Sequence, residues 1–289
     1  MALLPETIAV DGAELHYKSV GRGPALLAIG GAGAGVLEFR RLARRLAKEF
    51  RVISYDRRGT LQSTGRTDRA LDIAQESRDI VTLLDALEVR QAVVFGTCGG
   101  AAVGFDFVTR YPNYVRAYVV HEPITIRILP DVDEQRAFFQ GLCRLNERQG
   151  SVAAYLAWTD SIGLDSEPTF GRRSLARAKR DGDFVFRHQI MEMVEFMPDL
   201  AAVKEAGTCT VVAAGDGSLS GDYCYVRIAR AIADTLGCPL ETFPGHHHAY
   251  EDRPDDFSRS LAETIHKFCP EPKLRTRLRV APPRARRCS

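Results

Sequence analysis

The chain has 289 residues, of which 45% are hydrophobic and 26% are charged, as in an ordinary globular protein. This length can bury a sizeable core, and we expect one main domain that carries an insertion. No apolar run approaches the roughly 18 residues of a membrane helix, and the start of the chain lacks the pattern of a secretory signal. We therefore expect no membrane span and a cytoplasmic location.

The positive charge is concentrated at the carboxyl end of the sequence. The chain has a formal net charge of +2, but residues 270–289 alone contribute +6, which leaves −4 for the rest. This segment also contains four prolines and few apolar residues, a composition typical of a disordered or loosely draped tail. Because such tails more often solubilise than bind, we expect no nucleic acid partner.

The seven cysteines are widely scattered and form no C-x-x-C pair. This pattern argues against a disulfide framework and against a zinc ribbon. We expect mostly free thiols.

Strand and helix patterns alternate over the first part of the chain, up to residue 121. Two short alternating segments, 7–10 and 14–18, flank a turn and predict a β-hairpin. Nearly continuous apolar runs, typical of parallel strands buried on both faces, follow at 25–30, 52–56, 92–96 and 117–121. Segments with helical periodicity lie between these runs, at 39–50, at 70–87 and after residue 99. The alternation predicts an α/β fold with a mostly parallel central sheet flanked by helices.

The strand signal disappears between residues 123 and 206, where only helical patterns occur, at 134–148, 151–163 and 183–197. Strand and helix patterns then return, at 209–215, 223–237, 240–243 and 255–268. The sequence therefore predicts a core made of residues 1–122 and 207–269, an inserted helical lid at 123–206 and a basic tail at 270–289.

Cys98 lies in the stretch FGTCGGAAVG, between a predicted strand and a predicted helix. Its neighbours Gly96 and Gly100 complete the pattern G-x-C-x-G, in which small residues allow a strained turn to present a nucleophile. The alternative is a buried, inert thiol at a tight helix packing, which is common for free cysteine.

Three further motifs accompany this turn: GGAGAG at 30–35, YDRRGT at 55–60 and FPGHHHAY at 243–250. Together with the elbow they make the chain resemble the α/β-hydrolases of the small, lid-bearing bacterial type, over nearly everything except the tail. Most members carry Ser at the elbow. Cys98 departs from that pattern and resembles the elbows of dienelactone hydrolases and polyhydroxyalkanoate synthases.

A thiol acts as a thiolate and needs a neighbouring base. Alignment of Pro244 and Gly245 with the P-G-G-H pattern of the family places His247 in the catalytic position. Three successive histidines cannot converge on one point, so we expect no metal site there. The resemblance leaves His246 as a candidate for lining the substrate pocket.

The carboxylate that orients the histidine is the least determined part of the site. The usual G-x-x-D position of the family holds Ser218 here, and Asp216 is displaced from it by two residues. Glu122 occupies the alternative position, at the end of the preceding strand, and we favour it over Asp216 by analogy with the family. The alternative role for Glu122 is to anchor the entrance of the lid.

The resemblance implies an oxyanion hole of backbone N–H groups, one from Gly99 and one from Ala32 or Gly31. The glycine loop could instead be a simple flexible connection. Among the lid residues, Trp158, Phe186 and Met191 are candidates for lining an apolar pocket, although the lid also needs its own core.

These observations predict a cysteine acyl-transfer enzyme that acts on an ester, lactone or thioester of a bulky, partly apolar small molecule, with specialised metabolism as one setting. Hydrolysis, as in a lactonase or thioesterase, and transfer or cyclisation, as in an acyltransferase, both remain open. We expect no cofactor, because the glycine loop lacks the Lys of a P-loop. Two alternatives remain: a cofactor-free lyase or isomerase with His247 as base, and a ligand-binding protein. A homodimer is left open.

Overall fold

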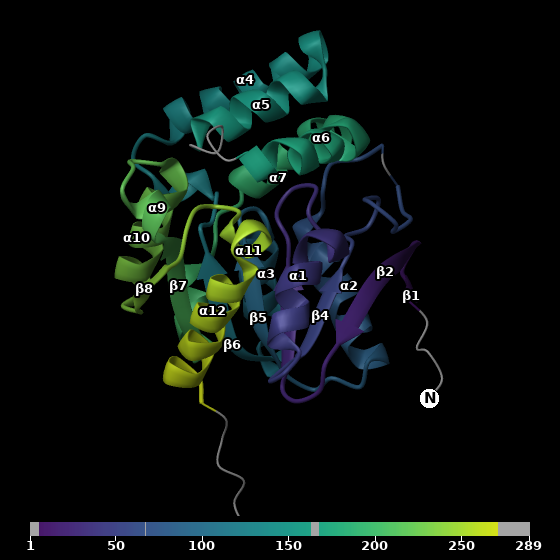
Figure 1. The fold of residues 1–289 in the computed structure, drawn as a ribbon, viewed down its shortest axis with the longest axis vertical. Helices are drawn as coiled ribbons and strands as arrows, with labels where there is room; N and C mark the ends of the chain where they lie inside the picture. Colours follow the sequence, from purple (N-terminus) through teal and green to yellow (C-terminus); the bar gives the residue numbers. More distant parts are fainter. Residues whose placement is uncertain (1–5, 67, 163–167, 271–289) are drawn as a thin grey trace, which may run out of the picture.

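The computed structural model describes residues 6–66, 68–162 and 168–270. Its centre is an eight-stranded sheet with the order β1-β2-β4-β3-β5-β6-β7-β8 (Figure 1). β2 pairs antiparallel with β1 and β4, and all other neighbours are parallel. This confirms the predicted α/β fold. The strands are β1 (Thr7–Val10), β2 (Ala13–Val20), β3 (Ala25–Ile29), β4 (Arg51–Tyr55), β5 (Ala92–Thr97), β6 (Val115–His121), β7 (Cys209–Gly215) and β8 (Leu240–Phe243).

Helices cover both faces of the sheet, and each face has its own hydrophobic core. In β3, Leu26 and Ala28 pack on one face while Leu27 and Ile29 pack on the other, which explains why the parallel strands are continuously apolar. The first core includes α1 (Val36–Leu46) and α12 (Pro254–Phe268), and the second includes α2 (Ile73–Ala86), α3 (Gly100–Arg110) and α10 (Cys224–Leu236).

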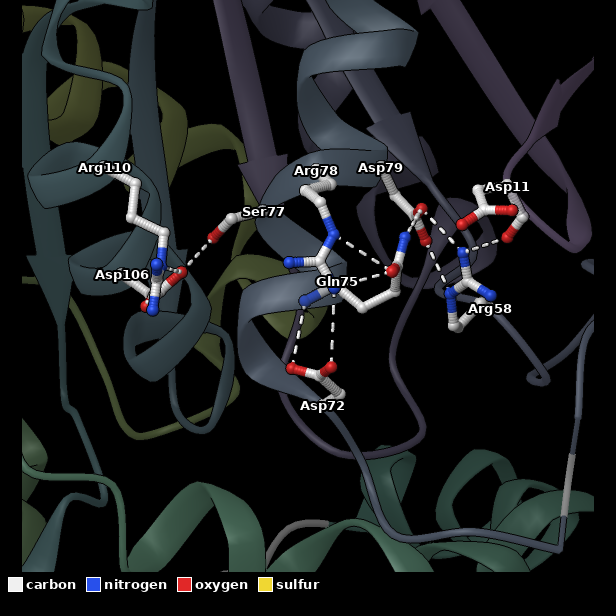
Figure 2. Close-up of polar contacts among 9 residues, drawn as sticks. All are labelled: Asp11, Arg58, Asp72, Gln75, Ser77, Arg78, Asp79, Asp106 and Arg110. Atoms are coloured by element: carbon white, nitrogen blue, oxygen red, sulfur yellow. Dashed lines mark hydrogen bonds and ion pairs between the residues drawn. The ribbon is translucent and has the colours of Figure 1, made fainter.

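Polar contacts fix α2 to its surroundings (Figure 2). The Ser77 hydroxyl donates to Asp106 on α3 at 2.7 Å, and Arg110 pairs with the same carboxylate. On the other side of α2, Arg58 donates two hydrogen bonds of 2.7 Å to Asp79. Because Asp79 is buried, this bidentate pair holds the segment after β4 against the helix.

The described part of the segment between β6 and β7 is helical, and its helices α4 to α7 lie above the sheet (Figure 1). It contains η2 (Ile126–Ile128), α4 (Val132–Gln149), α5 (Ser151–Ser161), α6 (Pro168–His188), α7 (Ile190–Val194) and α8 (Leu200–Glu205). We call the helices α4 to α7 the lid. The helix expected at 183–197 is divided between α6 and α7, because Gln189 leaves the helical backbone with φ −120°.

Three short helices complete the described chain: η1 (Pro112–Tyr114), α9 (Asp216–Leu219) and α11 (Ala249–Asp252). Within the described ranges, no helix is both long and apolar enough to cross a membrane. The cysteines at 98, 143, 209, 224, 238 and 269 are free thiols. Residues 271–289, which make up nearly all of the predicted tail, lie outside the described residues.

Candidate active site

Cys98 occupies a strained turn between β5 and α3. Its φ is +55°, a left-handed conformation that costs a non-glycine residue on the order of 1–3 kcal/mol. A Cβ at Gly96 would lie 3.1 Å from the Cα of Ala101, and one at Gly100 only 2.3 Å from the carbonyl oxygen of Ile29. Both glycines are therefore needed for the close approach of the turn to its neighbours, as the elbow pattern predicts.

Glu122 and His247 form a buried pair beside this turn. Glu122 follows β6 directly, as Cys98 follows β5, and it has a φ of +44°. The Nδ1 of His247 donates to one carboxylate oxygen of Glu122 at 2.7 Å, and the N–H of Gly215 donates to the other at 2.8 Å. Both side chains are fully buried. The carboxylate thus fixes the orientation of the imidazole ring.

The two groups of this pair have strongly shifted pKa values. Burial alone would lower the pKa of His247, but the charges and hydrogen bonds of Cys98 and Glu122 outweigh it and raise the pKa to about 10. Burial opposes ionisation of Glu122, yet His121, His247 and the Gly215 N–H together lower its pKa to about 2. Histidine and glutamate are therefore both charged at neutral pH.

His121 lies next to the pair but cannot supply its positive charge. Burial lowers the pKa of His121 to about 4, so this ring is neutral at pH 7. Its Nδ1 lies 2.9 Å from the hydroxyl of Thr97, and its ring packs edge to face against Phe257. At neutral pH the positive charge beside Glu122 therefore comes from His247.

The other acid considered from the sequence, Asp216, holds the backbone of the histidine loop. Its Oδ1 accepts hydrogen bonds of 2.7 Å from the N–H groups of both Gly217 and Gly245. Within the described residues, the Asp216 side chain makes no hydrogen bond to His247. The geometry therefore associates Glu122, and not Asp216, with the imidazole.

The three consecutive histidines have different surroundings. The Nε2 of His246 lies 3.5 Å from Asp252, while the Nδ1 of His248 lies 3.2 Å from Glu251. Within the described residues, no group of three His, Cys, Asp or Glu side chains is arranged to hold a metal ion. His246 is not among the residues that line the cavity over Cys98; its Nδ1 accepts a hydrogen bond of 3.2 Å from the backbone N–H of His248 in the same loop.

An apolar cavity lies between Cys98 and the lid. Its volume is about 30 Å³, which leaves room for only about two water molecules. Trp158 and Phe186 line it as predicted, but Met191 does not. The other lining residues are Gly31, Ala32, Ala34, Cys98, Leu142, Tyr155, Val185, Ile190, His248 and Tyr250.

Met193, and not Met191, is the methionine of α7 that packs against the turn at Cys98. It is fully buried, and a Cβ on Gly99 would lie 2.2 Å from its sulfur. The break at Gln189 resets the helical phase, so the side of α7 that faces the elbow carries residue 193. The periodicity of an unbroken helix could not have predicted this.

The glycine loop passes directly over the thiol. A Cβ on Gly31 would lie 3.0 Å from the Cys98 sulfur and 3.5 Å from the backbone nitrogen of Gly99. Among the described residues, the N–H groups of Gly31, Ala32 and Gly99 donate no backbone hydrogen bond. These donors remain available for an oxyanion that would form on a substrate bound to Cys98.

Sequence reasoning missed a buried ion pair that joins the lid to the core. Arg177 of α6 donates to both carboxylate oxygens of Glu251, at 2.9 and 3.0 Å, and lies 3.3 Å from Glu38. Arg177 is 5% exposed. An arginine on a predicted lid helix gives no signal of burial by itself, so only its partners reveal this contact.

The mostly parallel sheet, the strained turn after β5 and the histidine loop after β8 are together typical of one class of α/β folds. The chain has the α/β-hydrolase fold. Residues 24–154 match the family model described as alpha/beta hydrolase fold.

Individual proteins agree with this assignment. The chain is 28% identical over 265 residues to "Uncharacterized hydrolase YraK" of Bacillus subtilis, covering 90% of this chain and 96% of that protein. A thermophilic esterase from Thermogutta terrifontis superposes with a TM-score of 0.74 at 19% identity, over 91% of this chain and 97% of the esterase. The enol-lactonase from Burkholderia xenovorans LB400 superposes with a TM-score of 0.71 at 18% identity, over 90% and 99% of the two chains.

Proposed function

We propose that the protein is an acyl-transfer enzyme with Cys98 as nucleophile, His247 as acid and base, and Glu122 as the orienting carboxylate. The observation that carries the proposal is a thiol on a strained turn, together with a buried imidazole that has a carboxylate 2.7 Å behind it. Cys98 is among the groups that raise the pKa of His247, and the Nε2 of that ring has no hydrogen-bond partner within the described residues, so it is available to the reacting groups.

The reaction follows from these positions. The thiolate of Cys98 attacks the carbonyl carbon of an ester, lactone or thioester, and the carbonyl electron pair becomes an oxyanion facing the N–H groups of Gly99, Gly31 and Ala32. The oxyanion collapses, the leaving group departs with the proton of His247, and an acyl thioester remains on Cys98. Water or another acceptor then attacks this thioester, gives its proton to His247 and releases the thiolate.

The cavity favours an apolar acyl group that enters when the lid moves. Its volume of about 30 Å³ is too small for a bulky substrate, and Trp158 and Phe186 of the lid helices line it. We therefore propose that the insertion at residues 123–206, through its helices α4 to α7, opens for the substrate and excludes water once closed. Slow access of water would favour transfer or cyclisation over hydrolysis.

The relatives support chemistry at an acyl carbon. The protein from B. subtilis is named a hydrolase, and the two structural neighbours are an esterase and an enol-lactonase. These names agree with the proposed reaction type and leave the substrate of this chain to be identified.

The test is intact-protein mass spectrometry after brief exposure to a panel of activated esters, lactones and thioesters. We expect an acyl adduct that maps to Cys98, is absent in Cys98→Ala and forms more slowly in His247→Ala. Cys224→Ala is the matched control: burial raises the pKa of Cys224 to about 12, so its loss should leave the adduct unchanged.

The opposite result is equally informative. If no probe labels the wild type, and Cys98→Ala still converts a substrate, His247 acts as the base of a lyase or isomerase. If Cys98→Ala binds a ligand tightly without any product, the fold serves as a binding protein. An adduct on Cys224 or Cys143 in place of Cys98 would also overturn the proposal.

A further inference from the structure

Arg57 is a buried arginine directly behind the glycine loop, in the turn that follows β4. It is 1% exposed. Its Nη1 donates to the carbonyl oxygens of Gly30 and Gly31, at 2.5 and 2.8 Å, and its Nη2 donates to the side-chain oxygen of Gln189 at 3.1 Å. One guanidinium group therefore joins the glycine loop to the lid.

The two carbonyls belong to the peptide units that supply the candidate oxyanion donors. The N–H of Gly31 shares a peptide plane with the Gly30 carbonyl, and the N–H of Ala32 shares one with the Gly31 carbonyl. No peptide bond in the described chain is cis, and in a trans peptide the C=O and N–H point in opposite directions. Arg57, by holding both carbonyls, fixes the direction of both N–H groups.

We propose that Arg57 is a positioning residue that sets the oxyanion donors of the glycine loop and couples them to the lid through Gln189. The inference rests on the proposed acyl-transfer function and concerns the regulation of that same site. A guanidinium is suited to this role because its planar fork can bind several acceptors at once. Its charge also polarises the two amides, which strengthens their N–H groups as donors.

The surroundings of Arg57 leave its charge available for these carbonyls. Glu76 on α2 is fully buried, and neither of its carboxylate oxygens has a hydrogen-bond partner within the described residues. Burial raises the pKa of Glu76 to about 8, against the opposing effect of Arg57. At neutral pH the group is mostly protonated, so it does not compete with the carbonyls as a full counter-charge.

The connection to the lid is local and buried. Gln189 is 1% exposed and stands at the break between α6 and α7. Phe186 and Ile190, on either side of it in sequence, line the cavity over Cys98. Displacement of this segment by a substrate would therefore alter the hydrogen bond between Gln189 and the guanidinium of Arg57, the group that orients the glycine loop.

The adjacent Arg58 provides a matched control. It belongs to the same turn but its side chain binds Asp79 and the backbone of Asp11 (Figure 2). It donates to neither carbonyl of the glycine loop. A change at Arg58 tests the general effect of losing a partly buried arginine contact, without altering the oxyanion donors.

The experiment compares two reactions of Cys98 in wild type, Arg57→Lys, Arg57→Met, Gln189→Met and Arg58→Lys. Acylation by the activated ester or thioester that labels the wild type requires an oxyanion hole, whereas alkylation by iodoacetamide forms no oxyanion. We expect Arg57→Met to slow acylation about 10²-fold, the scale for loss of an oxyanion donor, with alkylation changed less than about threefold.

Each variant has a defined expectation. Arg57→Lys retains the charge without the fork and should fall between wild type and Arg57→Met. Gln189→Met removes only the contact with the lid and should slow acylation about 3- to 10-fold, which keeps the test valid if the Arg57 variants fail to fold. Arg58→Lys should leave both rates near those of wild type.

Two different failures can be distinguished. Equal acylation of wild type and the folded Arg57 variants, or a parallel loss of acylation and alkylation, overturns the positioning role alone. If wild-type Cys98 is alkylated by iodoacetamide but is acylated by no probe, the proposed function itself fails and this inference fails with it.

Discussion

His247 and His248 are neighbours in one loop, and each is buried with its Nδ1 against a glutamate, yet their electrostatic states are opposite. For His247, Cys98 and Glu122 outweigh the effect of burial and raise the pKa to about 10. Burial lowers the pKa of His248 to about 4 despite Glu251. The residue type and the burial are the same, so a third partner decides the charge.

The third partner differs in sign. Beside His247 it is the thiol of Cys98, which favours a proton on the imidazole. Beside His248 it is the positive charge of His247, with a smaller contribution from Arg177, whose guanidinium donates to both oxygens of Glu251. A contact with a glutamate thus raises the pKa of a buried histidine only where no neighbouring positive charge opposes it.

The comparison predicts its largest difference in the rate of Cys98 acylation, measured after substitution of each histidine. We expect His247→Gln to slow acylation about 10²- to 10⁴-fold, the usual contribution of a positioned acid and base. His248→Gln should slow it less than about tenfold, because His248 only lines the cavity. Single-turnover kinetics with the labelling probe measure both rates, and comparable losses in the two variants would contradict the assignment.

Stability should respond to pH in opposite directions at the two sites. The folded pKa of His248, about 4, lies below its unfolded value, so its stabilising contribution is present above about pH 6.5 and is lost as the pH falls towards 4. The folded pKa of His247, about 10, lies above the unfolded value, so its contribution is present below about pH 6.5 and is lost as the pH rises towards 10.

Urea unfolding of wild type and the two Gln variants at pH 5, 7 and 9 measures these contributions. From pH 7 to 5, wild type should lose roughly 2 kcal/mol more free energy of unfolding than His248→Gln. From pH 7 to 9, it should lose roughly 2 kcal/mol more than His247→Gln. Identical pH dependence in all three proteins would show that neither histidine titrates as described.

The smallest expected effect concerns Asp216, the acid that does not contact His247. Asp216→Asn weakens two hydrogen bonds to the backbone of the histidine loop and should lower the free energy of unfolding by about 1 kcal/mol. Acylation should stay within about threefold of wild type, whereas Glu122→Gln should slow it strongly. A large loss of acylation in a folded Asp216→Asn protein would reopen the question of which carboxylate serves His247.

Local sequence patterns predicted the bounds of several strands, but they misplaced the start of the first helix. The predicted strands at 7–10, 209–215 and 240–243 agree with β1, β7 and β8, since turn residues and apolar runs mark them directly. The first helix begins at Val36 rather than at the predicted residue 39. Its first N–H is bound by the carboxylate of Asp56 at 2.8 Å, a partner 20 residues away that helical periodicity does not reveal.

The sequence by itself determined the strand and helix order, the strained turn at Cys98 and the loop that carries the histidines, because periodicity and glycine placement are local properties. Only the tertiary structure decided which charges meet. Glu122 and His247 are 125 residues apart in sequence, and Arg57 and Gln189 are 132 apart. Such pairings depend on how the sheet and lid bring distant segments together and on the burial that results, since burial determines how strongly the paired charges interact.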